Sequence, residues 1–142
     1  MIDRTDLEIL KVLEKDSSLP YAEIARLLKM KEATVRKRIL TLKERGVIKK
    51  FTIIVDPVKI GLKTVAIIGL DVDPTKLLEA CEKLSQIPEI KYVATSTGDH
   101  MIMTEVWATD GKHLSQIISE KIGRTEGVKK VCPSIILEKI KD

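Results

Sequence analysis

Apolar residues recur at helical spacing through the first 45 positions of the chain. One stripe follows Asp3, which suits the N-cap of a helix over residues 3–15, and the next follows Pro20, which suits a first helical turn. The two stripes consist of Leu7, Ile9, Leu10 and Leu13, and of Ile24, Leu27 and Leu28. We expect two amphipathic helices that pack these side chains inward.

A third helix is predicted for residues 32–45, after a three-residue turn. Val35, Ile39 and Leu42 stand at i, i+4 and i+7, so one face of this helix is apolar and packs on the first two helices. Gly46 suits the position just after a helix end. Two helices joined by so short a turn predict a helix-turn-helix unit.

Residues 47–55 change to a β-branched pattern that predicts a strand, which Pro57 ends. We interpret residues 48–62 as a linker strand between two domains, residues 1–47 and residues 63–142. A single strand in this position leaves its backbone hydrogen-bonding groups unpaired. The same strand of a second copy is the economical partner, which predicts a homodimer.

The second half of the chain alternates strand and helix patterns in the order β-α-β-β-α-β. Strands are predicted at residues 65–72, 90–95, 101–108 and 128–137, and helices at 74–85 and 112–122. The predicted buried faces are Leu77, Leu78, Cys81 and Leu84 on one helix, and Leu114, Ile117, Ile118 and Ile122 on the other. This order predicts a ferredoxin-like α/β sandwich. The expected fold class is therefore α+β, a winged-helix-like helix-turn-helix domain followed by that sandwich.

Positive charge is concentrated in the first half of the chain. Residues 1–63 hold 15 basic and 9 acidic residues, whereas residues 64–142 hold 10 and 12. Between Arg26 and Lys50 there are ten Lys or Arg and two acids. This asymmetry favours a polyanionic partner for the first half. A solvated basic face with no partner is the alternative.

The third helix is the candidate for reading DNA, because the N-terminal part of such a helix usually contacts base edges in the major groove. The candidate contacts are Lys31, Glu32, Ala33, Thr34, Arg36, Lys37 and Arg38. Glu32 either accepts from a cytosine amine or interacts with the positive end of the helix dipole. A second set is either bound to phosphates or solvated: Lys43, Arg45, Lys49 and Lys50.

Other function classes find little support in the sequence. No apolar stretch reaches the length of a membrane span, and Asp3 and Arg4 interrupt any signal-like start, so we expect a cytoplasmic protein. Cys81 and Cys132 form no metal-binding motif, and we expect no metal or cofactor. The chain has no Asn, two Gln and 19 Lys, which favours a thermophilic source.

The chain resembles the Lrp/AsnC family, also called feast/famine regulators, in its archaeal form. The carrying segments are IDRTDLEILKVLEKD and EIARLLKMKEATVRKRILTLKERGVIKKFTIIVDPVKIG in the first half, and TGDHMIM and EGVKKVCPSIILEK in the second. The resemblance covers essentially the whole chain. It implies a transcriptional regulator whose C-terminal domain senses a ligand, and which dimerises through the linker strand and the sheets and often assembles into octamers.

The resemblance also implies an amino-acid effector bound near Thr97, Gly98, Asp99, His100 and Ser134. The family loop commonly has a second acid where this chain has Met101. Together with the basic half, the resemblance predicts binding to double-stranded DNA at a palindromic operator. Two rival hypotheses remain at this point. One is an oligomeric ligand sensor that acts through protein partners, and the other is a small enzyme that uses Asp99 and His100.

Overall fold

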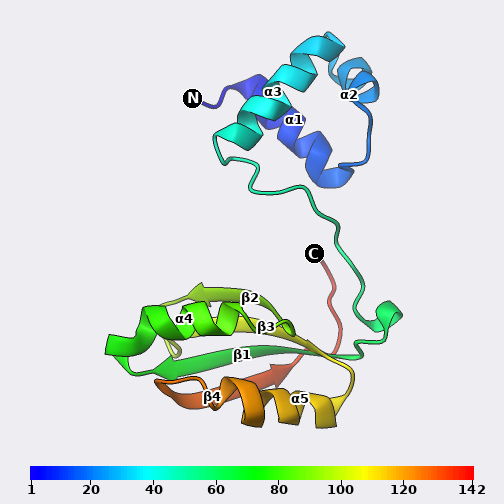
Figure 1. Cartoon of the computed structure of the whole chain (residues 1–142). Helices are drawn as coiled ribbons and strands as arrows, with labels where there is room; N and C mark the ends of the chain where they lie inside the picture. Colours follow the sequence, from blue (N-terminus) through cyan, green and yellow to red (C-terminus); the bar gives the residue numbers. More distant parts are fainter. The chain divides into compact units, whose positions relative to one another are not determined.

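The computed structural model describes residues 1–142 and divides into two units, Met1–Ile53 and Ile54–Asp142 (Figure 1). Each unit has a hydrophobic core of its own. No helix of either unit combines the length and the apolar character that a membrane crossing demands.

The first unit consists of the three predicted helices, α1 (Arg4–Lys15), α2 (Tyr21–Leu28) and α3 (Glu32–Glu44). Its core contains Ile9, Ile24, Ala25, Val35 and Ile39. The buried face predicted for α3 is confirmed, since Val35, Ile39 and Leu42 are all buried.

The predicted faces of α1 and α2 are wrong at Leu7 and Leu27, which are about half exposed. α1 turns Ile9 toward the other helices, and Leu7, two residues earlier, lies about 200° away around the helix. On α2 the buried residues are Ile24 and the small Ala25, whereas the apolar pattern predicted Ile24 and Leu27.

Caps and turns define both ends of the helices in this unit. Asp3 and Asp6 form a capping box at the start of α1, in which each carboxylate accepts from the other residue's backbone N–H. Lys29 adopts a left-handed conformation, with φ 54°, in the turn before α3. After α3, Gly46 has φ 76° and its N–H donates to the carbonyl of Lys43. The prediction that Gly46 stops this helix is confirmed.

The linker strand predicted within residues 48–62 does not form in the single chain, which has only a short 3-10 turn there, η1 (Val58–Ile60). The physical reason is that a strand needs a hydrogen-bonded neighbour, and no segment of the same chain supplies one. The division between the two units falls after Ile53, inside the predicted linker. Pairing with a second copy stays a prediction.

The second unit is a four-stranded antiparallel sheet with two helices. Its elements are β1 (Thr64–Val72), α4 (Leu77–Ser85), β2 (Ile90–Thr95), β3 (Ile102–Ala108), α5 (Gly111–Ile117) and β4 (Val128–Ile135). The strand order is β2-β3-β1-β4. The ferredoxin-like prediction is confirmed.

Short irregular helices extend both main helices of the second unit. A 3-10 turn, η2 (Pro74–Lys76), precedes α4, and a π-helical turn, η3 (Ile118–Ile122), continues α5. Leu78, predicted to be buried, is exposed because Ala80 and Leu84 form the face of α4 that packs on the sheet.

Both helices cover the same face of the sheet, because one core cluster joins α4 and α5 to Ile68 and Leu70 of β1. The opposite face carries no helix. Alternation along β1 places Ile67 and Gly69 on this open face, and their neighbours on β3 are Glu105 and Met103. The open face therefore mixes apolar and charged side chains.

Candidate nucleic-acid interface

The exposed face of α3 lies opposite its buried stripe. Because Val35 and Ile39 point inward, helical geometry turns Ala33, Lys37 and Leu40 outward, and all three are exposed. Leu40 is 53% exposed, although its chain neighbour Ile39 is 2% exposed. Sequence reasoning missed Leu40, and the helical spacing from Val35 and Ile39 was the signal that would have found it.

Among the predicted DNA contacts, Lys31, Ala33, Thr34 and Lys37 are all exposed at or near the start of α3. Lys31 is the N-cap residue, and its side chain makes no capping hydrogen bond. This end of α3 therefore presents two amines, a methyl and a hydroxyl to solvent.

Arg36 is held by two neighbours on the same side of α3. Its Nη2 lies 3.5 Å from Oε1 of Glu32, one turn earlier. Its guanidinium carbon lies 5.7 Å from the centroid of the Tyr21 ring on α2, a distance typical of a cation–π contact. Glu32 itself sits in the first turn of α3, where the helix dipole favours an acid.

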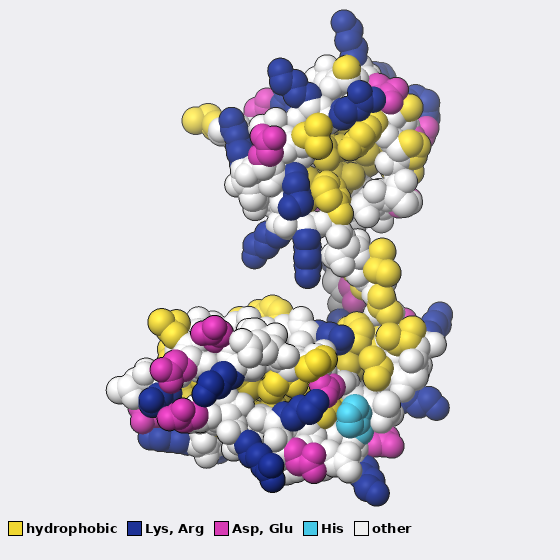
Figure 2. Space-filling model, viewed as in Figure 1, with side chains coloured by type: hydrophobic (Ala, Val, Ile, Leu, Met, Phe, Trp, Pro, Cys, Tyr) yellow, Lys and Arg dark blue, Asp and Glu magenta, His cyan; other side chains and the backbone are white.

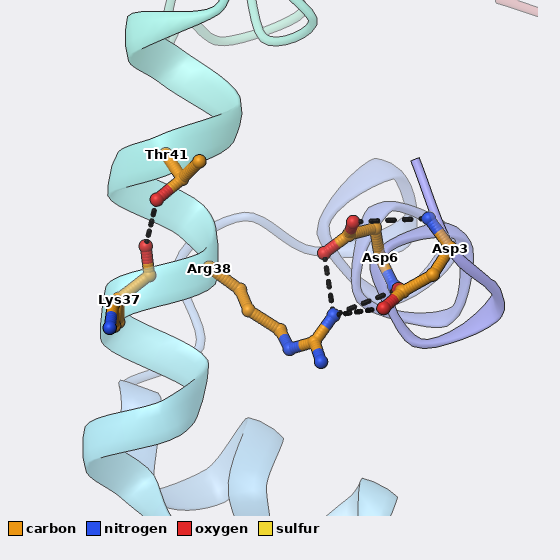
Figure 3. Close-up of polar contacts among 5 residues, drawn as sticks. All are labelled: Asp3, Asp6, Lys37, Arg38 and Thr41. Carbon is orange, nitrogen blue, oxygen red and sulfur yellow. Dashed lines mark hydrogen bonds and ion pairs between the residues drawn. The ribbon is translucent and has the colours of Figure 1, made fainter. Parts of the chain in front are cut away.

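Arg38 contacts the start of α1, as Figure 3 shows. Its Nη1 donates to Oδ1 and Oδ2 of Asp3 at 2.8 and 2.7 Å, and to Oδ1 of Asp6 at 3.1 Å. Its side chain is 32% exposed. The Arg38 guanidinium, with the backbone N–H of Asp6, lowers the pKa of the Asp3 carboxyl below its ordinary value of 3.8.

These contacts engage Arg38 within the single chain, and its predicted DNA contact stays a prediction. The guanidinium fixes α3 against the capped start of α1. Sequence reasoning missed this pair because 35 positions separate Asp3 from Arg38, and no local pattern links residues so distant.

A groove of about 550 Å³ lies between the start of α1 and one flank of α3. The residues that line it are Met1, Ile2, Asp3, Asp6, Ala33, Thr34, Lys37, Arg38, Thr41, Leu42 and Arg45. In the space-filling view, Lys and Arg side chains project from several sides of this unit (Figure 2). The groove therefore runs along α3 from Ala33 and Thr34 near its start to Arg45 just after its end.

Sequence comparisons agree with this geometry in both halves of the chain. Residues 2–49 match the winged helix-turn-helix DNA-binding family, and residues 65–142 match the Lrp/AsnC ligand binding domain. The chain belongs to the Lrp/AsnC family of transcriptional regulators. Regulators of this family bind DNA, and the match to the winged helix-turn-helix family covers all three helices of the first unit.

Relatives of this Lrp/AsnC regulator match along its whole length. The HTH-type transcriptional regulator LrpA of Pyrococcus horikoshii is 49% identical over 141 residues, covering 99% of this chain and 100% of the relative. LrpA of Pyrococcus abyssi is 48% identical over the same shares. These sources agree with the expected archaeal, thermophilic origin. The crystal structure of PH0061 is 30% identical with a TM-score of 0.91, covering 100% of this chain and 97% of that one.

The residues predicted to bind an effector lie in two places of the Lrp/AsnC domain. Thr97, Gly98 and Asp99 are exposed on the loop between β2 and β3, and Ser134 is exposed on β4. Gly98 has φ 96°, so the loop needs glycine for its turn. The loop is closed by the hydrogen bond that Ser96 Oγ donates to the carbonyl of His100 at 2.7 Å.

His100 differs from the other loop residues because its ring lies directly over Gly69. A Cβ at Gly69 would come within 2.3 Å of the ring carbon Cδ2. The ring Nδ1 is shielded from solvent without a hydrogen bond, and lies 3.7 Å from Oδ1 of Asp71. The structure therefore brings His100 beside Asp71, a residue that sequence reasoning did not select, whereas Ser134 pairs with Ile67 farther along β1.

Proposed function

We propose that this regulator places α3 in the major groove of a palindromic operator and reads it through the exposed start of that helix. The proposal rests on the amphipathic character of α3. Val35 and Ile39 are buried on one face, and the opposite face exposes Ala33, Lys37 and Leu40. Lys37 and Lys31 suit guanine or phosphate, and the methyl groups of Ala33 and Leu40 suit thymine. Such DNA contact implies a cytoplasmic site of action.

The palindromic operator that we propose requires a two-fold symmetric homodimer. Ile53 and Ile54 are both more than 70% exposed in the single chain, which is costly for two large apolar side chains next to each other. Pairing of this segment between two copies would bury both side chains. A two-fold dimer presents two α3 helices to half-sites about 34 Å apart. Assembly of dimers to an octamer is the larger form that the family resemblance implies.

Response to an amino acid is the proposed mode of regulation. One protein that shares this fold, at 22% identity, is the Neisseria meningitidis transcriptional regulator NMB0573, whose crystal structure is a complex with L-Met. In the present chain, the Asp99 carboxylate suits an ammonium group and the backbone N–H groups near Gly98 suit a carboxylate. Thr97, His100 and Ser134 complete the proposed effector-binding set.

Selection of bound fragments from the source genome, repeated with and without each amino acid, tests target and effector together. We expect a two-fold symmetric consensus whose enrichment changes with one amino acid. Binding to the selected duplex should weaken with rising salt, because phosphate contacts release counterions. No enrichment, and no salt-dependent affinity for any duplex, would instead favour the sensor that acts through protein partners.

The residue-level proposal needs a matched pair of variants. Lys37→Ala removes a cation from the exposed face of α3. Lys11→Ala removes the same charge from the exposed side of α1, about 200° around that helix from buried Ile9. We expect Lys37→Ala to weaken operator binding by about 1–3 kcal/mol if it contacts a base, and Lys11→Ala to leave binding unchanged. Equal effects of the two variants would show that Lys37 acts only through total charge.

A further inference from the structure

The groove between α1 and α3 has a charge arrangement of its own. Its lining contains three cationic side chains and two carboxylates. Both carboxylates, on Asp3 and Asp6, accept hydrogen bonds from Arg38. Lys37 and Arg45 are exposed and form no ion pair in the structure. The acids are therefore satisfied within the protein, whereas two cations face the groove unpaired.

The groove follows one flank of α3 for much of its length. Thr34, Thr41 and Arg45 stand at i, i+7 and i+11, a spacing that keeps them on one side of the helix over about 16 Å. Arg36 and Lys43, also seven residues apart, lie on the other flank. α3 therefore carries a separate polar row on each side of its outward face.

A helix in the major groove has one DNA strand on either side of it, because the groove is about as wide as the helix. If α3 docks as proposed above, the row with Arg36 faces one strand, and the groove beside Arg45 faces the other. Arg38, which also lines this groove, extends from α3 to Asp3 and Asp6 of α1 (Figure 3). The charge of Arg38 offsets part of the negative charge that the two carboxylates would otherwise direct at a nearby phosphate.

We propose that the α1–α3 groove binds backbone phosphates of the second DNA strand. Arg45 and Lys37 supply the positive charge, and the Thr34 hydroxyl supplies a donor. The Thr41 hydroxyl already donates to the carbonyl of Lys37 at 2.9 Å. Thr41 therefore lines the groove without offering its hydrogen to a phosphate. The groove fixes the register of the protein on DNA and carries no base specificity. This inference rests on the docking of α3 in the major groove.

The test combines a protein variant with neutral phosphates in the DNA. Arg45→Gln removes the charge, Arg45→Lys keeps it, and Lys11→Gln is the control for total charge on another helix. Each full-length protein is titrated with the selected operator at several salt concentrations. The same operator is then prepared with single methylphosphonate substitutions along each strand.

If the groove binds phosphates, the binding constant of Arg45→Gln should depend less steeply on salt. The slope of log binding constant against log salt concentration should be shallower by about 0.9 for each lost phosphate contact. The affinity deficit of Arg45→Gln should shrink about threefold between 50 and 200 mM salt. Arg45→Lys and Lys11→Gln should keep the slope of the wild-type protein. Methylphosphonates at one or two positions of a single strand should weaken the wild-type protein and have little effect on Arg45→Gln.

The outcomes separate the two proposals. Operator binding with an unchanged slope for Arg45→Gln, and an interference pattern identical to that of the wild-type protein, would overturn the groove alone. A wild-type protein that binds no duplex would overturn the docking of α3 as well. Circular dichroism of each variant checks that it is folded, and Arg45→Ala, which also removes the charge, replaces Arg45→Gln if that variant is unfolded.

Discussion

Two adjacent residues of α3 test the two-sidedness of this helix, because Ile39 is buried and Leu40 is exposed. Replacement of either by Ala removes three carbons from the same element. We expect Ile39→Ala to reduce the stability of the first unit and Leu40→Ala to leave it nearly unchanged. For DNA binding we expect the reverse order, since Leu40, unlike Ile39, lies on the face of α3 that we propose contacts the operator.

The magnitudes follow from burial. Ile39 is 2% exposed, so the three lost carbons cost about 2.4 kcal/mol of transfer free energy, at about 0.8 kcal/mol for each buried methylene. The cavity left behind raises the expected loss to about 3 kcal/mol, within the usual range of about 2–5 kcal/mol. Leu40 is 53% exposed, and a surface change of this kind stays within about 0.5 kcal/mol.

Urea denaturation with two probes measures both effects. Ellipticity at 222 nm follows the helices of the chain, and fluorescence of Trp107, the single tryptophan, follows the second unit. Ile39→Ala should move the part of the ellipticity transition that comes from α1, α2 and α3, and leave the Trp107 transition in place, because the two units have separate cores. A 53-residue unit has only about 3–8 kcal/mol of stability, so Ile39→Val, at about 1 kcal/mol, provides a milder step.

Equal destabilisation by Ile39→Ala and Leu40→Ala would refute the orientation of α3. A Leu40→Ala protein with wild-type stability and wild-type operator affinity would leave the buried face correct and remove Leu40 from the DNA-binding side. Binding titrations are performed below the urea concentration where either variant begins to unfold.

Three further predictions follow from other contacts. Asp6→Asn should lower operator affinity, because it weakens the ion pair that joins Arg38 to α1. A gain in affinity would mean that the released Arg38 contacts DNA. The wild-type protein should be more stable than Arg38→Gln above pH 4, and this difference should shrink as pH falls through the lowered pKa of Asp3, because the protonated carboxyl loses its ion pair. Acid titration followed at 222 nm measures the difference in stability. A difference that stays constant down to pH 2 would contradict the prediction. Gly69→Ala should destabilise the second unit by about 1–3 kcal/mol, because its Cβ meets the His100 ring; the Trp107 transition reports this, and a second change, His100→Ala, should restore most of the loss.

Local periodicity predicted the parts of the fold that depend on neighbours along the chain. Val35, Ile39 and Leu42 defined the buried side of α3, and Gly46 marked its end, because both signals lie within a few turns of one helix. The order of strand and helix patterns predicted the ferredoxin-like unit for the same reason. The charge excess between Arg26 and Lys50 located the DNA-binding half.

Features that depend on residues far apart in the chain could not be predicted from the sequence. Leu7, Leu27 and Leu78 each lie beside an apolar stripe, and only the packing of other helices or the sheet decides which neighbour turns inward. The contact of Arg38 with Asp3 joins residues 35 positions apart, which no local pattern links. The predicted linker strand needs hydrogen bonds from a neighbouring strand, which the single chain does not supply.

Cleavage of the operator from a chelated iron on α3 tests the docking of this helix most directly. The chelate is attached through Ala33→Cys in a protein with Cys81→Ala and Cys132→Ala, and a second preparation carries it through Lys11→Cys on α1. We predict strong cleavage from residue 33 at two symmetric positions about 34 Å apart, and weak cleavage from residue 11. Strong cleavage from residue 11 with none from residue 33 would contradict the assignment of α3 to the major groove.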